Sequence, residues 1–200
     1  MGSDKPKIDL DPETLLSAYA QGIFPMADRD GTIRFYTADP RGIIPLDEGF
    51  HIPGTLRQLL KKEPFEIRIN YDFSGTMRAC MEARTDGTWI NRELIDAYSR
   101  LHELGFAHSV EAWEGSELVG GLYGVTLGAA FFGESMFHRK PNASKIALVH
   151  LVKQLRQQGF ELLDSQATTS HLKRFGATDI PASEYLLRLR RALNKRCDFS

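Results

Sequence analysis

The sequence predicts an α+β protein built on a mixed sheet, and three observations support this class. Residues 91–166 follow the order helix, three strands, helix, strand. The segments 129–137 and 160–166 are apolar, and the leucines between them recur with helical spacing. Residues 23–54 contain four prolines, which indicates irregular structure with short strands. A meander followed by a helical crossover to a parallel strand is typical of α+β layered folds.

The first ninety residues are predicted to alternate short helices and strands. A helix at 12–22 has Pro12 in its first turn and Gly22 at its end. Thr55 opens a second helix, with Gln58 three residues later as a capping box. The other elements expected here are strands at 33–36, 42–45 and 65–70 and a helix at 74–83.

The remaining residues give a clearer pattern. Asn91 is expected to cap a helix that Gly105 ends, and Asn142 a helix that Gly159 ends. The expected strands lie at 108–113, 117–126, 129–137 and 160–166, and a last helix at 183–195. This order matches the central part of the acetyltransferase-like (GNAT) fold. We therefore expect a small, irregular N-terminal α/β subdomain at 1–54 and a GNAT-like C-terminal domain at 55–200.

Composition excludes several classes of protein. Two cysteines, Cys80 and Cys197, are too few for a disulfide framework or a cysteine-based zinc site. No apolar run approaches the ~18 residues that a membrane helix needs, and residues 1–11 lack the apolar core of a signal peptide. We expect a cytoplasmic protein with no membrane partner and no metal. A net charge of −1 still permits a local basic cluster.

Two buried carboxylates mark the candidate site. Glu134 lies within the apolar run 131–137, and Asp164 within 162–166. An unpaired buried carboxylate costs several kcal/mol, so each must be paired, hydrogen-bonded or functional. Side chains two apart on a strand share a face, so Asp164 and Gln166 are expected to project together. The alternatives are that Asp164 caps a loop and that Glu134 pairs with Arg139 or a helix N-terminus.

The loop before the second long helix argues against coenzyme A. A pyrophosphate needs backbone N–H groups that glycines allow it to approach. Residues 138–144 contain no glycine, and Pro141 has no N–H. The chain also has no Gly-x-Ser-x-Gly, no Cys–His pair and no Walker glycine loop.

Seven short motifs, in one order and spacing, resemble the leucyl/phenylalanyl-tRNA–protein transferase family over residues 12–185. They are Tyr19–Pro25, Asp39–Arg41, Gly87–Ile90, Leu101–Gly105, Gly120–Gly124, Gly133–Phe137 and Asn142–Lys145. The resemblance implies transfer of Leu or Phe from aminoacyl-tRNA to proteins that begin with Arg or Lys, which marks them for degradation as N-degrons. It also implies a GNAT-like C-terminal domain and no cofactor.

The resemblance assigns roles by position. It implies that Asp164 and Gln166 are the catalytic pair. It implies substrate-binding residues at Glu134, Trp89, Tyr98, Leu122, Phe131, Met136, Leu148, Leu151 and Leu163. It implies tRNA contacts from Arg57, Lys61 and Lys62. We expect an apolar pocket to accept Met besides Leu and Phe. Glu134 and Asp86 are the candidates for binding the acceptor's basic side chain.

Aminolysis of an activated ester needs positioning more than a strong base. A side-chain amide is a very poor base, so we expect Gln166 to orient the amine while Asp164 accepts from the Gln166 NH₂ group. The family usually has tryptophan where this chain has Met26, and Phe35 or Tyr36 is the expected aromatic substitute for stacking the terminal adenosine. The alternative functions are an acyl-CoA N-acyltransferase and a non-catalytic tRNA- or peptide-binding protein.

Overall fold

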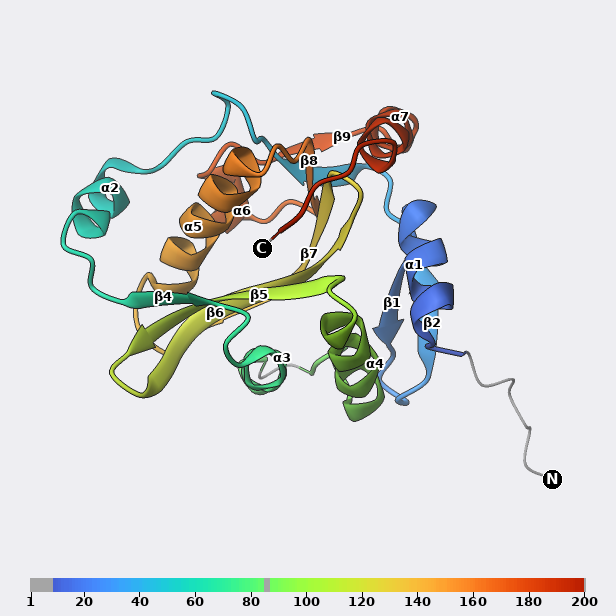
Figure 1. Ribbon diagram of the computed structural model, residues 1–200, viewed down its shortest axis with the longest axis horizontal. Coiled ribbons are helices and arrows are strands. Elements are labelled where there is room, and N and C mark those ends of the chain that lie inside the picture. Colours follow the sequence, from blue (N-terminus) through green and yellow to red (C-terminus); the bar gives the residue numbers. More distant parts are fainter. Residues whose placement is uncertain (1–8, 85–86, 200) are drawn as a thin grey trace.

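The computed structural model describes residues 9–84 and 87–199, which form two sheets with helices around them (Figure 1). In the small sheet, β1 (Phe24–Ala27) pairs antiparallel with β2 (Ile33–Tyr36). The large sheet has seven strands in the order β4-β5-β6-β7-β8-β3-β9. Its strands are β3 (Arg41–Ile44), β4 (Glu66–Ile69), β5 (Ala107–Glu114), β6 (Glu117–Leu127), β7 (Ala130–His138), β8 (Leu162–Gln166) and β9 (Thr178–Ile180).

Seven helices are assigned within the described residues. They are α1 (Pro12–Ala20), α2 (Gly54–Leu60), α3 (Phe73–Glu82), α4 (Arg92–Glu103), α5 (Ala143–Gln157), α6 (Ser170–Lys173) and α7 (Ala182–Leu193). No helix in the described part of the chain is both long enough and apolar enough to cross a membrane.

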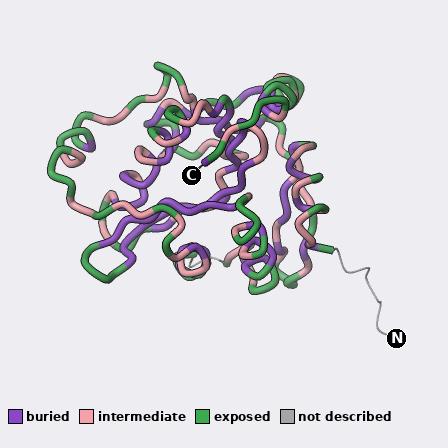
Figure 2. The backbone as a smooth tube through the Cα atoms, viewed as in Figure 1, coloured by how far each residue is buried: buried purple, intermediate pink, exposed green. Residues whose placement is uncertain are grey.

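Among the described residues the core has two large apolar clusters, one on each face of the large sheet, and a small third one formed by Ala112, Val119 and Ala143. Side chains alternate along a strand, so Leu122 and Phe131 pack in one cluster, and Tyr123 and Phe132 in the other. Helix α5 supplies the first cluster, and α1, α3, α4 and α7 supply the second. Figure 2 shows buried backbone through the central strands and exposed backbone at α2 and α7.

The α+β class and the mixed sheet are confirmed. β5, β6 and β7 form an antiparallel meander, and α5 carries the chain to β8, which pairs parallel with β7. Residues 23–54 are less irregular than expected, because they form β1 as well as β2 and β3. The elements α6 and β9 were not predicted; both are short, which leaves little periodicity to detect.

Two expected helix caps are wrong. Asn142 adopts a left-handed conformation (φ +70°) and forms no capping hydrogen bond; its side chain accepts from Lys145 instead. Helix α2 begins at Gly54 after Pro53, also with no side-chain cap, so the box at Thr55 and Gln58 does not form. In contrast, Asn91 caps α4 as expected, accepting from the Leu94 N–H at 2.9 Å.

The strand β3 determines where the site forms. It lies between β8 and β9 and runs antiparallel to both, so residues from the start of the chain enter the large sheet. The division at residue 54 stays a prediction, and β3 joins the two expected parts. On its other side β8 pairs with β7 only as far as Asp164 and Phe132. β7 continues with β6 to His138, so the two parallel strands part.

Candidate functional site

A cavity of about 1100 Å³ lies where β7 and β8 separate. In a sheet with parallel strands, ligands bind beyond the strands' carboxyl ends at such a point. Its apolar lining comes from the small sheet, the large sheet, α5 and the loop before α4: Phe24, Met26, Ile44, Trp89, Leu122, Met136, Leu148, Leu151 and Leu163. Its polar lining includes Glu134, Asp164 and Gln166.

Asp164 is a fully buried and fully paired carboxylate. Arg41 of β3 donates to it twice, from Nε to Oδ1 at 2.9 Å and from Nη2 to Oδ2 at 2.6 Å. Tyr185 of α7 donates to Oδ2 at 2.7 Å, and the backbone N–H of Gln166 to Oδ1 at 2.7 Å. A bidentate guanidinium offsets the cost of burying the charge and fixes its direction. We call Arg41, Asp164 and Tyr185 the clamp.

Gln166 ends β8 in a strained backbone conformation. Its φ is +61°, and the Ala167 N–H bonds back to the Ser165 oxygen at 2.6 Å, which closes a three-residue turn. The pairing of β8 with β3 shifts register here. Gly42 of β3 lies against this turn, because a Cβ there would stand 2.6 Å from the Ala167 carbonyl carbon. The side chain therefore leaves the strand at an angle that period-two alternation does not describe.

The expected contact between Asp164 and the Gln166 amide is wrong. Asp164 accepts from the Gln166 backbone, and the Gln166 NH₂ donates to Glu134 Oε1 at 3.1 Å. The clamp has already supplied Asp164 with donors, so the amide turns to the carboxylate across the cavity. Glu134, not Asp164, fixes the orientation of the Gln166 amide.

Glu134 is buried without a cationic partner. Tyr19 of α1 donates to Oε1 at 2.7 Å, and Tyr98 of α4 hydrogen-bonds to Tyr19 behind it. Oε2 is buried and has no partner among the described residues. Burial raises the pKa of Glu134 to about 8, against the hydrogen bond from Tyr19, which lowers it. Arg139 donates to Leu118 and Glu82, so it does not neutralise Glu134.

Most of the predicted site residues lie together. Of the substrate-binding set, Glu134, Trp89, Leu122, Met136, Leu148, Leu151 and Leu163 line the cavity. Phe131 and Tyr98 are fully buried and do not line it: Phe131 packs in the apolar cluster behind the leucines, and Tyr98 hydrogen-bonds to Tyr19. Phe35 and Tyr36 do not line it either; the lining includes the aromatic residues Phe24, Trp89 and Tyr123.

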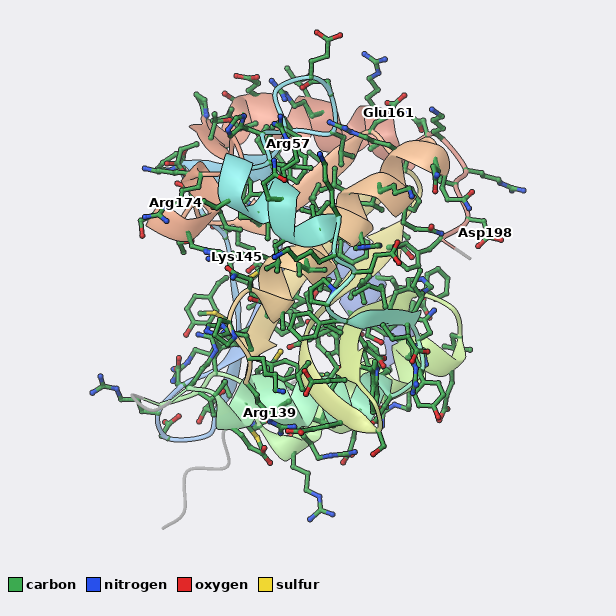
Figure 3. The ribbon with its side chains drawn as sticks, turned by 90° about the vertical axis from the view of Figure 1, so that its left-hand side faces the viewer. Arg57, Arg139, Lys145, Glu161, Arg174 and Asp198 are labelled. Atoms are coloured by element: carbon green, nitrogen blue, oxygen red, sulfur yellow. The ribbon has the colours of Figure 1, made fainter. Side chains whose placement is uncertain are left out.

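The predicted tRNA-contacting cluster is outside the cavity. Arg57 lies on α2 and Lys61 and Lys62 follow its last residue; all three are exposed. Figure 3 shows Arg57 on the same side of the molecule as Lys145 and Arg174. Asp86, the other candidate for the acceptor's basic side chain, lies outside the described residues.

Sequence reasoning missed the partners of both carboxylates. Tyr19 and Arg41 belong to quoted motifs, but nothing in their spacing shows that they contact residues more than a hundred positions later. Tyr185 lies in a helix whose apolar face predicts only core packing. A buried carboxylate needs hydrogen-bond donors, so the sequence indicates that each carboxylate has partners but not which residues they are.

Comparisons with known proteins agree with the resemblance. A family model described as leucyl/phenylalanyl-tRNA protein transferase matches residues 43–190, and the model of that family's N-terminal domain matches residues 8–39. Proteins named leucyl/phenylalanyl-tRNA–protein transferase from Akkermansia muciniphila and Herpetosiphon aurantiacus are 56% and 53% identical to this chain. The matches cover 94% and 95% of this chain and 98% of each relative.

The fold is also found in a more distant protein. The structure of L-PGS from Bacillus licheniformis matches with a TM-score of 0.51 at 13% sequence identity. The match covers 93% of this chain and 71% of that one. At this identity the likeness concerns the fold alone.

Proposed function

The chain belongs to the leucyl/phenylalanyl-tRNA–protein transferase family, and we propose that its cavity transfers Leu, Phe or Met to proteins that begin with Arg or Lys. It is an aminoacyltransferase that takes its aminoacyl group from tRNA. The reaction belongs in the cytoplasm, where it creates N-degrons. The observation that carries this function is an apolar cavity with an amide and a protonatable carboxylate at one side.

We propose a GNAT-like architecture for the part of the chain that holds the cavity. Its support is the parting of the parallel strands β7 and β8 beside the crossover helix α5. The loop between β7 and α5 lacks the glycines that a coenzyme A pyrophosphate needs, so an aminoacyl ester is a better substrate here than an acyl thioester.

The apolar lining is proposed to bind the transferred side chain. Leu148 and Leu151 of α5 face Leu122 and Leu163 of the sheet. Such a pocket discriminates by only ~1–3 kcal/mol per methylene, which is why Leu, Phe and Met are all accepted. Met136 adds an adaptable side chain to the wall. Side chains branched at Cβ fit a narrow slot less well, so Ile and Val react more slowly.

The reaction forms one bond and breaks another. The acceptor's α-amine attacks the ester carbonyl, a C–N bond forms, and the bond to the ribose oxygen of the terminal adenosine breaks. We assign the orientation of the amine to the carbonyl oxygen of Gln166, whose NH₂ group is occupied by Glu134. The amine enters as a donor, and an amide oxygen held in place is a suitable acceptor for it.

The proton is assigned to Glu134. An α-amino group has a pKa of ~7.7–8.0, and the pKa of Glu134 is raised to about 8, so a proton passes between them with little free-energy cost. Its free Oε2 receives the proton in the ionised fraction of the protein, which grows as pH rises toward the Glu134 pKa of about 8. The leaving ribose oxygen then takes a proton, directly or through water. Burial, and then the charge of Glu134, raise the pKa of Tyr19, so Tyr19 stays a donor throughout.

The body of the tRNA is proposed to contact Arg57, Lys61 and Lys62. An apolar pocket for the amino-acid side chain cannot tell one tRNA from another, so contacts to phosphate and sugar are expected here. Replacing the three with Gln weakens tRNA binding and flattens its dependence on salt by about 0.9 per lost phosphate contact. An unchanged slope in a filter-binding titration would remove this helix from the interface.

A transfer assay tests the function against its alternatives. The protein is incubated with a peptide that begins with Arg, together with Leu-tRNA or acetyl-CoA, and the peptide is weighed by mass spectrometry. A gain of one leucine is expected. A gain of one acetyl group would instead support an acyl-CoA enzyme, and tRNA binding without any gain a non-catalytic protein.

A second assay separates positioning from base catalysis at Gln166. Gln166→Ala is expected to lower kcat by about 100-fold, as for a misplaced reactant, with little change in tRNA binding. Gln166→Glu keeps the size of the side chain and adds a true base, yet it loses the donor to Glu134. Full activity of Gln166→Glu beside an inactive Gln166→Ala would contradict the positioning role.

A further inference from the structure

Four basic side chains lie in or near the wall of the cavity. Lys145, His138 and His171 line the cavity. Burial, and then the positive charges of Lys145, His138 and Arg174, lower the pKa of His171. We call these four residues the cationic rim. Among the described residues, none of the four forms an ion pair.

Lys145 stands where a helix disfavours a cation. It is in the first turn of α5, which contains no acidic residue, and the N-terminus of a helix carries a partial positive charge. Its ammonium donates to the Asn142 side chain at 2.9 Å, and Asn142 has a left-handed backbone. The Lys145 ammonium thus lies close to the partial positive charge of the helix N-terminus, and the first turn holds no acidic side chain to offset the two. Such a local conflict is typical of a binding site.

His171 supplies an independent sign of a missing ligand. Its Nε2 is buried and has no hydrogen-bond partner among the described residues. Buried polar atoms are nearly always bonded, and an unpaired one needs a reason. The residue belongs to the wall of the cavity, together with Thr169 and Leu172.

We propose that the cationic rim binds a phosphodiester of the nucleotide strand whose terminal adenosine carries the reacting ester. The proposal rests on the function proposed above. The ester is assigned to Gln166 and Glu134, and His138 lies four residues beyond Glu134 on β7. At ~3.3 Å per residue this is about 13 Å along the strand, so one cavity holds both the ester and the backbone behind it.

The charges favour a phosphate over the acceptor protein. The acceptor begins with Arg or Lys, which the rim repels. The carboxylates among the described residues of the cavity wall are Glu134 and Asp164: the first carries a proton near neutral pH and the second is paired with Arg41. The rim is separate from Arg57 on α2, although Figure 3 shows Lys145, Arg174 and Arg57 on one side of the molecule.

Two small substrates isolate the phosphodiester. One is phenylalanyl-adenosine, which has the ester and no phosphate. The other is cytidylyl-(3′→5′)-adenosine esterified with phenylalanine, which adds one phosphodiester. Lys145→Gln and Arg174→Gln are compared with Lys153→Gln, an exposed cation eight residues further along α5 that does not line the cavity. Arg174 is exposed, so its replacement does not threaten the fold.

The expected result is a change in KM that depends on the phosphate. For the dinucleotide ester, each rim variant raises KM about tenfold, as for one lost charge-assisted contact, and flattens its salt dependence by about 0.7. For phenylalanyl-adenosine, the KM of each rim variant stays within about twofold of the wild-type value. Lys153→Gln changes the KM for neither substrate. Equal changes for both substrates, or none for the dinucleotide, would overturn the proposal.

A binding measurement keeps the proposal separate from the proposed reaction. The wild-type protein is titrated with cytidylyl-(3′→5′)-adenosine or with adenosine alone, neither of which reacts. The imidazole resonances of His171 are expected to shift with the dinucleotide and not with adenosine. If transfer fails but these resonances shift, the proposed function is wrong and the rim still binds phosphate. If transfer occurs and they do not shift, the rim proposal is wrong.

Discussion

The two buried carboxylates of the cavity have opposite surroundings. Asp164, on β8, accepts four hydrogen bonds, two of them from Arg41. Glu134, on β7, accepts from two neutral donors at one oxygen and leaves the other without a partner in the described structure. Asp164 forms a buried ion pair with the guanidinium of Arg41, whereas burial raises the pKa of Glu134 to about 8.

The difference separates Asp164, which supports the fold, from Glu134, which we propose takes part in the reaction. A saturated ion pair cannot take up a proton or a ligand without losing contacts that hold the fold. A carboxylate with a free oxygen and a pKa near that of an amine can do both. Gln166 lies between them: its backbone is fixed by Asp164 and its side chain by Glu134. We therefore propose that the site is anchored on β8 and reactive on β7.

The largest effect is expected from Asp164→Asn. Removing the charge leaves Arg41 buried and unpaired, which lowers the free energy of unfolding by about 3–5 kcal/mol. Urea unfolding followed by circular dichroism measures the change. The control is the double variant Arg41→Met with Asp164→Leu, whose cost is expected to be smaller than the sum of the single ones. Wild-type stability of Asp164→Asn would mean that the clamp does not support the fold.

Glu134→Gln is expected to show the reverse pattern. The amide keeps the size of the side chain, so the protein folds, but the proton acceptor is lost and kcat falls about 10²- to 10⁴-fold. The measurement is kcat against pH for both proteins, since the wild-type profile has a step near the Glu134 pKa of about 8 that the variant lacks. A step retained in the variant would assign the titration to another group.

A smaller effect concerns stability against pH. The folded pKa of Glu134 lies above its ordinary value of 4.5, so the folded state binds a proton that the unfolded state releases. The stabilisation is complete below about pH 4.5 and is lost as pH rises through about 8. Relative to Glu134→Gln, the wild type is expected to lose more than about 1 kcal/mol between pH 5 and pH 8.5. Parallel unfolding curves at both pH values would contradict this.

The smallest effect is expected at the turn around Gln166, whose backbone contacts Asp164 and whose side chain contacts Glu134. Gln166 has a φ of +61°, which glycine adopts freely and alanine does not. Gln166→Gly is therefore expected to be more stable than Gln166→Ala by about 1 kcal/mol, while both lose the amide. Differential scanning calorimetry compares the two. Equal melting temperatures would indicate that the turn relaxes once the amide is removed.

Local signals in the sequence predicted most of the fold. Period-two and helical spacing located β5, β6, β7 and α5 within one or two residues, because these elements are long and bury one face. The carboxylates were found by the same logic, as charges in apolar strands. What spacing does not contain is the partner of a buried group, so Arg41 and Tyr19 were missed. Short segments such as β9 and α6, and the left-handed Asn142 and Gln166, depend on tertiary contacts.

The position of β3 has a consequence for how the protein is made. Arg41 and Asp164 are 123 residues apart in the chain, and β3 takes its place only between two strands that are translated near the end. Contacts of such long range form late in folding. A nascent chain that already displays the basic residues of α2 has no anchored Gln166 until β8 and β9 have been synthesised and paired with β3. We therefore expect no aminoacyl transfer from an incomplete copy of the protein that lacks β8 and β9.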